Sequence, residues 1–140
     1  MTDYNLQRFL DAQNSVLDTV SQELVRGKKR THWMWYVFPQ IQGLGSSSSA
    51  QYYAIQSLNE AQAYHDHEVL GERLRSWTAM ANQHDGVSSD ELFGPVDGMK
   101  FRSSMTLFSM VECASPVFRE ALDVFFSGEP DARTLEILGK

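Results

Sequence analysis

Apolar residues recur along the chain with the period of amphipathic helices. In residues 3–25 their spacings are three, four and seven, which lie on one stripe of a helix. The same period predicts helices at 31–38, 50–64, 68–82, 97–113 and 116–126, a helical turn at 89–93 and a last short helix near the C-terminus. No convincing pair of strands is present. We therefore predict an all-α fold of six or seven helices that form a single domain over residues 1–140.

Residues that cap or break helices mark the ends of these segments. Asp3 or Asn5 can begin the first helix, and Gly27 can end it. In segment 31–38 the run of Trp, Tyr, Val and Phe also favours a strand. We choose a helix because Thr31 is a good N-cap, Pro39 would stop it and no second strand exists to pair with it. The other predicted N-caps are Ser49, Asp66, Asp97 and Asp131.

The helix faces also predict which side chains are buried. Trp77 and Phe108 fall on the apolar faces of their segments, so we expect both in the core. Gln13 interrupts the apolar stripe of the first segment. We expect it at the edge of that stripe and partly exposed, rather than in a buried polar contact, because most glutamines are exposed.

Composition describes an ordinary globular chain. Of the 140 residues, 42% are hydrophobic and 21% are charged. Cys113 has no partner for an intramolecular disulfide, no secretory signal is visible, and no apolar run reaches the ~20 residues of a membrane span. We therefore expect a cytoplasmic protein without membrane contacts. The net charge of −6 argues against general nucleic-acid binding.

Residues 26–45 carry a local positive charge, opposite in sign to the net charge of the chain. No Asp or Glu occurs from Leu24 to Asn59, where an even spread of acids would place about four or five. The stretch joins a cationic cluster to a histidine, four aromatic residues and a Gly-x-Gly turn. Farther on, Arg102 and Thr106 lie one turn apart on a predicted helix, with Ser103 beside Arg102. Arginine and hydroxyl groups are common anion ligands, and tryptophan offers a stacking surface.

These features predict a pocket for an anionic molecule that resembles a nucleotide or ADP-ribose. The candidate ligand-binding residues are Lys28, Lys29, Arg30, Trp33, Trp35, Tyr36, Gln40, Gly43, Gly45, Ser46, Arg102, Ser103 and Thr106. His32 is the candidate catalytic residue, as a general acid or base. The pattern predicts binding without deciding whether a reaction follows. We expect no cofactor and no metal, because His65, Asp66 and His67 are adjacent and look like a turn.

Structural readings of the same residues stay open. The tryptophans can be core residues beside a solvated basic turn, and His32 can be structural. The loop at 43–49 can be a flexible connector or a phosphate cradle. A different class of function is an interaction module that docks a protein through an aromatic and basic surface. A concave pocket that gathers His32 and Arg102 would favour the small molecule, and a flat patch of exposed tryptophan would favour the module.

The sequence Gly-Lys-Lys-Arg-Thr-His-Trp-Met-Trp-Tyr-Val-Phe-Pro-Gln, followed by Gly-Leu-Gly-Ser, resembles the bacterial family filed as domain of unknown function 1810. The resemblance extends over nearly the whole chain, through Tyr53-Ala54-Ile55, Leu70-Gly71 and the segment 100–108. It implies a compact, mainly helical protein with no assigned reaction. Some similar proteins carry the label calpastatin, which does not suit this chain, because inhibitors of that type are disordered and poor in aromatic residues.

Overall fold

The computed structural model describes residues 4–140. Within that range it contains ten helices and no strand, so the predicted all-α class is confirmed, while the predicted number of helices was too low. The helices are α1 (Gln7–Asn14), α2 (Leu17–Arg26), α3 (Met34–Val37), α4 (Ser48–Tyr52), α5 (Leu58–Asp66), α6 (Leu70–Asn82), α7 (Ser89–Phe93), α8 (Pro95–Ser109), α9 (Pro116–Phe126) and α10 (Ala132–Leu138). Throughout residues 4–140, every helix is too short or too polar to span a bilayer.

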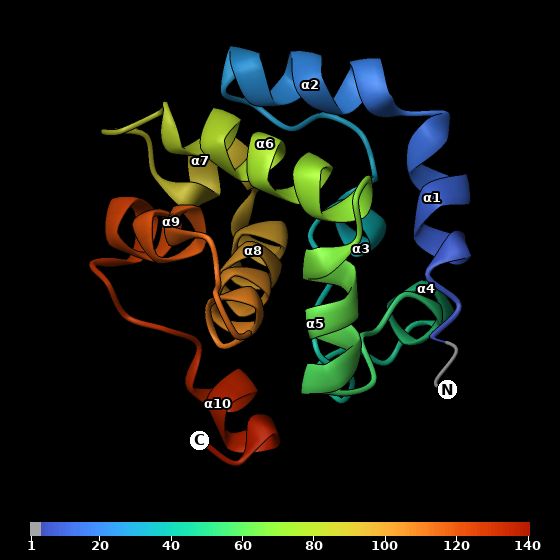
Figure 1. Cartoon of the computed structure of the whole chain (residues 1–140). Coiled ribbons are helices and arrows are strands. Elements are labelled where there is room, and N and C mark those ends of the chain that lie inside the picture. Colours follow the sequence, from blue (N-terminus) through green and yellow to red (C-terminus); the bar gives the residue numbers. More distant parts are fainter. Residues whose placement is uncertain (1–3) are drawn as a thin grey trace.

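The first predicted helix is two helices that meet at a sharp corner (Figure 1). The chain leaves helical geometry at Val16, whose φ and ψ are −125° and 11°. The break lets α1 pack on α3 while α2 packs on α6. Gly27 ends α2 in the left-handed region, as predicted. Of the two predicted starting caps, Asp3 lies outside the described residues, and Asn5 lies before α1, whose N-cap position is Leu6.

The predicted helix 50–64 is also two helices, because the chain between α4 and α5 becomes extended. Ile55 donates its backbone N–H to the Gln40 carbonyl, and the Ile55 carbonyl accepts from Gln42, at 2.8 Å each. This bridge ties the linker after α4 to the loop after α3. Ser57 then caps α5, and Ser47 rather than Ser49 caps α4. A single continuous helix could not have made this pairing.

Two other predicted caps were wrong. The Thr31 hydroxyl donates to the Glu23 carboxylate, and α3 begins only at Met34. Before α6, the ring nitrogen of His67, rather than Asp66, accepts the N–H groups of Val69 and Leu70.

Later segments follow the predictions more closely. The turn at 89–93 and the helix at 116–126 lie where we expected. Asp131 caps α10 by accepting from the Thr134 N–H at 2.9 Å. Helix α8 differs, because it begins at Pro95 and ends at Ser109, so Asp97 lies inside its first turn instead of capping it.

Helix α8 lies in the middle of the fold and packs against α3, α5, α7, α9 and α10 (Figure 1). Its buried Phe101 stacks on Phe93 at 4.5 Å between ring centroids and meets the edge of Phe38 at 4.9 Å. Trp77 and Phe108 are buried, as predicted. The aromatic contacts attach α3 to α8, and this attachment fixes one wall of the site described next.

Candidate functional site

The basic stretch is held in place by an acidic residue from just outside it. Glu23 on α2 is 5% exposed. Its carboxylate accepts hydrogen bonds from the backbone N–H groups of Arg30 and Thr31, from the Thr31 hydroxyl and from the indole of Trp33, at 2.7–3.1 Å. Burial raises the pKa of this carboxyl, but these four hydrogen bonds outweigh it and lower the pKa to about 2. Although residues 24–59 contain no Asp or Glu, the folded chain therefore places the Glu23 carboxylate against this stretch.

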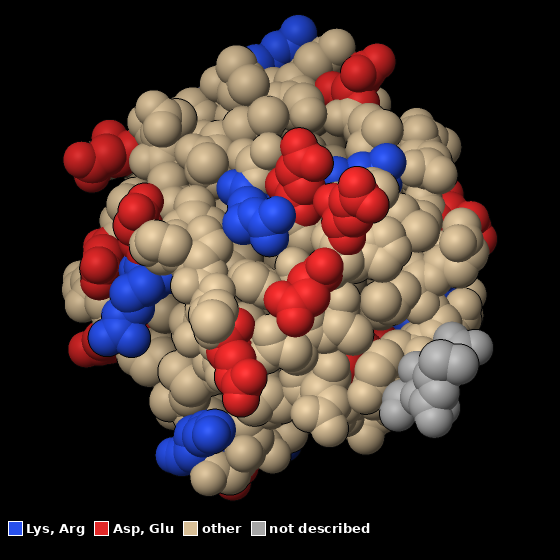
Figure 2. All heavy atoms as spheres, in the orientation of Figure 1, with Lys and Arg blue, Asp and Glu red and all other residues tan. Residues whose placement is uncertain are grey.

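The three adjacent cations of this stretch, Lys28, Lys29 and Arg30, have different environments. Lys28 and Arg30 are exposed. Lys29 turns inward, where its ammonium pairs with Asp97 of α8 at 2.8 Å and lies 5.1 Å from the centroid of the Trp33 ring. Acidic and basic side chains are also interspersed on the face drawn in Figure 2. The cationic cluster of the sequence is thus a hydrogen-bonded turn whose most buried cation is paired.

The aromatic residues of α3 have different positions. Trp33 is 1% exposed and belongs to the core. Tyr36 is partly buried, and its carbonyl accepts from Gln13 at 2.7 Å. Gln13 is fully buried and also contacts Tyr64 and Arg73, so its predicted place at an exposed edge was wrong. Trp35 differs from its neighbours because its ring borders open space.

A pocket of about 340 Å³ lies beside Trp35, and we call it the Trp35 pocket. Its walls come from α3, from the loop at 40–45, from α4 with the residues that follow it, and from α8. Aromatic and apolar surface is supplied by Met34, Trp35, Phe38, Ile41 and Tyr53. The polar groups are the amides of Gln40, Gln42 and Gln51 and the ammonium of Lys100, which lies 4.9 Å from the centroid of the Trp35 ring. Burial, followed by the neighbouring Tyr52, raises the pKa of Tyr53, which therefore stays protonated at neutral pH.

The Gly-x-Gly loop forms part of this pocket. Gly43 has a φ of +103°, and a Cβ at Gly45 would lie 2.6 Å from the Cβ of Ala50, so the loop can approach α4 only with glycine at position 45. Helix α4 has five residues, and the Ser47 hydroxyl caps it by accepting from Ala50. The loop therefore supplies a wall, while the end of α4 is already occupied by its own cap. Ser46 is not among the pocket residues, and its carbonyl accepts from Gln51.

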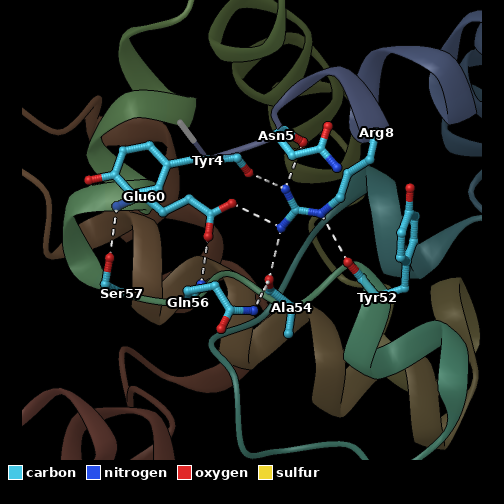
Figure 3. Close-up of polar contacts among 8 residues, drawn as sticks. All are labelled: Tyr4, Asn5, Arg8, Tyr52, Ala54, Gln56, Ser57 and Glu60. Carbon is cyan, nitrogen blue, oxygen red and sulfur yellow. Dashed lines mark hydrogen bonds and ion pairs between the residues drawn. The ribbon is translucent and has the colours of Figure 1, made fainter. Parts of the chain in front are cut away.

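A buried ion pair holds the wall that carries Tyr53 (Figure 3). Arg8 donates to the carbonyls on either side of that residue, Tyr52 at 2.9 Å and Ala54 at 3.0 Å, and to Glu60 at 2.9 Å. Glu60 in turn accepts from the backbone of Gln56 at 2.7 Å. Since this guanidinium and carboxylate are almost entirely buried and fully hydrogen-bonded, they fix the linker between α4 and α5.

The second predicted group lies on another side of α8. Arg102 donates to the carbonyl of Glu129 at 3.0 Å and packs against Phe126. Ser103 and Thr106 donate back to the carbonyls of Met99 and Arg102 within the same helix. The structure therefore does not bring Arg102, Ser103 and Thr106 to the Trp35 pocket. Arg102, through Glu129, and Thr106, whose hydroxyl oxygen accepts from the Asp131 N–H at 2.8 Å, connect α8 to the segment before α10.

His32 is exposed and lines a second hollow beside the Trp35 pocket, together with Lys29. The other histidine cluster of the sequence makes local contacts. His65 and Asp66 form a 2.9 Å pair, and the far nitrogen of His65 accepts from the backbone of Ser115. Within residues 4–140, no three His, Cys, Asp or Glu side chains are grouped as a metal site would require.

Of the predicted residues, Trp35, Gln40, Gly43 and Gly45 line the Trp35 pocket. Sequence reasoning missed Lys100, Gln42, Gln51 and Tyr53. The two missed glutamines and Tyr53 lie close in sequence to residues of the predicted site or of the predicted helix 50–64, but an uncharged side chain carries little signal by itself. Lys100 lies next to the buried Phe101, so the predicted helix could have placed it at the edge of the apolar face.

Comparison with known proteins agrees with this fold. A conserved hypothetical protein, Rv1873 from Mycobacterium tuberculosis, has a crystal structure that matches this chain with a TM-score of 0.95. The match covers 98% of both chains, and their sequences are 47% identical. No curated protein matches the chain. The sequence model described as protein of unknown function DUF1810 matches residues 3–138. The chain therefore belongs to the DUF1810 family.

Proposed function

We propose that this protein binds a small anionic molecule with a planar ring, such as a nucleotide, in the Trp35 pocket. The observation that carries the proposal is the Lys100 ammonium 4.9 Å from the Trp35 ring centroid at the wall of a concave pocket. A ring stacked on Trp35 would place its anionic group beside Lys100. The three amides offer both donors and acceptors, which suits the polar edge of a nucleobase.

The volume of the pocket limits the size of the ligand that fits in it. Its volume of about 340 Å³ lies at the lower end of the range for small-molecule sites. That volume suits a mononucleotide better than a whole ADP-ribose. His32 does not line this pocket, so the proposal is for binding, and catalysis by His32 stays a prediction.

The alternative function, a module that docks a protein through tryptophan, has less support. Trp33 is 1% exposed and Trp35 is partly buried, so they do not form a flat exposed patch. Arg102 is absent from the pocket, however, so only part of the arrangement that would favour a small molecule is present.

Thermal shift and calorimetric titration test the proposal. AMP, GMP, CMP and UMP are compared with the corresponding nucleosides, and at least one nucleotide should raise the melting temperature by mass action. Lys100→Met should weaken the nucleotide by about tenfold, the loss of one partly exposed charge contact, and should leave nucleoside binding almost unchanged. Trp35→Leu should weaken both.

Arg102→Met is the matched control, because it removes a cation from the same helix without touching the pocket. It should bind nucleotides as the wild type does. The proposal fails if no nucleotide binds, or if Lys100→Met and Arg102→Met have equal effects. In the first case, capture of a protein partner that depends on Trp35 would become the leading alternative.

A further inference from the structure

A second hollow of about 340 Å³ shares a wall with the Trp35 pocket. Met34, Trp35 and Lys100 line both spaces. We call the second space the Pro95 hollow, after the residue at the start of α8 that helps to line it. Since the shared wall contains both the stacking ring and the ammonium, a ligand held by Trp35 and Lys100 can extend from one space into the other.

The charges at this wall favour an anion with one negative charge. The carboxylate of Asp97 pairs with Lys29 at 2.8 Å and with Lys100 at 3.5 Å. Two ammonium groups and one carboxylate leave a net charge of +1. A phosphate diester carries one negative charge and matches this net charge, whereas a phosphate monoester carries ~1.5–2 at neutral pH.

The lining of the Pro95 hollow can hold a second group of the ligand. Phe93, Pro95 and Val96 present apolar surface, and Val96 is 67% exposed. Asp97 and His32 provide hydrogen-bonding groups beside that surface. Apolar surface next to a carboxylate and an imidazole suits a nucleoside, whose base can lie on the apolar residues while its ribose hydroxyls donate to the carboxylate.

We propose that the ligand is a small two-part molecule, in which two nucleosides are joined by one phosphate diester. One base stacks on Trp35, the diester lies beside Lys100, and the second nucleoside occupies the Pro95 hollow. This inference rests on the proposed function of the Trp35 pocket and extends it to the neighbouring space.

Calorimetric titration with matched probes tests the second half of the site. The probes are ApA, GpG, CpC and UpU, each compared with the methyl ester of the corresponding 5′-nucleotide, which has the same single charge but lacks the second nucleoside. At least one dinucleoside monophosphate should bind about tenfold more tightly than its methyl ester. Val96→Trp, which fills the Pro95 hollow, should abolish that gain and leave methyl ester binding unchanged.

Met99→Trp is the matched control. Met99 is on the same helix and is 72% exposed, but it does not line the hollow. Both variants should melt as the wild type does, because both side chains project from the surface, and Met99→Trp should keep the tenfold gain. Asp97→Asn raises the net charge of the wall to +2 and should shift the preference from the methyl ester toward the dianionic 5′-nucleotide.

The possible failures are distinguishable. If mononucleotides bind but the second nucleoside adds nothing, or if Val96→Trp and Met99→Trp behave alike, the two-part ligand is overturned while the proposed function stands. If no mononucleotide, methyl ester or dinucleoside monophosphate binds, both proposals are overturned. Tighter binding of a hexanucleotide than of the dinucleoside monophosphate would overturn the small-molecule assignment in favour of a nucleic-acid strand.

Discussion

Acidification should release the turn that precedes α3, through protonation of Glu23. The four hydrogen bonds to this carboxylate lower its pKa from 4.5 to about 2. A carboxyl with a lowered pKa in the folded state contributes stability above its unfolded pKa, and this contribution is lost as the pH falls through the folded pKa. The window for Glu23 is therefore between pH ~4.5 and ~2.

The size of the effect follows from this shift. A difference of ~2.5 pH units corresponds to roughly 3 kcal/mol of folding free energy at neutral pH. Because protonation is gradual, about 1 kcal/mol should be lost at pH 4 and about 2 kcal/mol at pH 3. Glu23→Gln removes the titrating group and should cost ~2–3 kcal/mol at pH 7, which lies within the range for hydrogen bonds to a charged group.

Urea unfolding of the wild type and Glu23→Gln between pH 7 and pH 3 measures this contribution. The stability difference between the two proteins should shrink by about 2 kcal/mol over that range, because protonated Glu23 resembles glutamine. Comparing the two proteins cancels the titration of the other carboxylates. Glu120→Gln, at an exposed position of α9, is the control and should show a constant difference from the wild type. A Glu23→Gln difference that stays constant with pH would refute the account of this turn.

Two further predictions concern the core and the wall of the Trp35 pocket. Phe108→Ala should lower the free energy of unfolding by ~3–5 kcal/mol, because it leaves a cavity under α5 and α9. Val25→Ala, at an exposed site, is the control and should change the free energy of unfolding little. A small loss for Phe108→Ala in denaturant melts would contradict the burial of Phe108. Arg8→Met should cost ~3–5 kcal/mol because it leaves the Glu60 carboxylate buried without its partner, and the double variant with Glu60→Gln should cost less than the two single losses together. Additive losses in that double-mutant cycle would show that the two side chains act independently.

Helical periodicity predicted the fold class but not where the chain bends. The apolar stripe of residues 3–25 continues across the break between α1 and α2, so its spacing carries no sign of the corner. The corner follows from packing, because α1 and α2 meet different helices. The break at Ile55 also depends on a distant segment, since its backbone pairs with the loop at 40–42. Tertiary contacts of this kind are not encoded in local spacing.

The charged residues of the site illustrate the same limit. The basic stretch itself contains no acid, yet Asp97, 68 positions after Lys29, lies 2.8 Å from that lysine. The local charge pattern therefore predicted a strongly positive surface, whereas in the folded chain Lys29 is paired with an acid.

Helix geometry decides which of Lys100 and Arg102 faces the Trp35 pocket. Each residue advances a helix by about 100°, so these two side chains leave α8 on either side of the buried Phe101. Only one of them can face α3, and the other must face α9 and α10. Arg102 was singled out because arginine and the hydroxyl groups beside it are common anion ligands, but that is a statement about chemistry and carries no direction. The direction is set by Phe101, which packs against Phe38 of the segment that follows α3, so that Lys100 lies over Trp35 and Arg102 reaches Glu129. Lys100 can therefore be selected over Arg102 only once the packing of Phe101 against Phe38 is known.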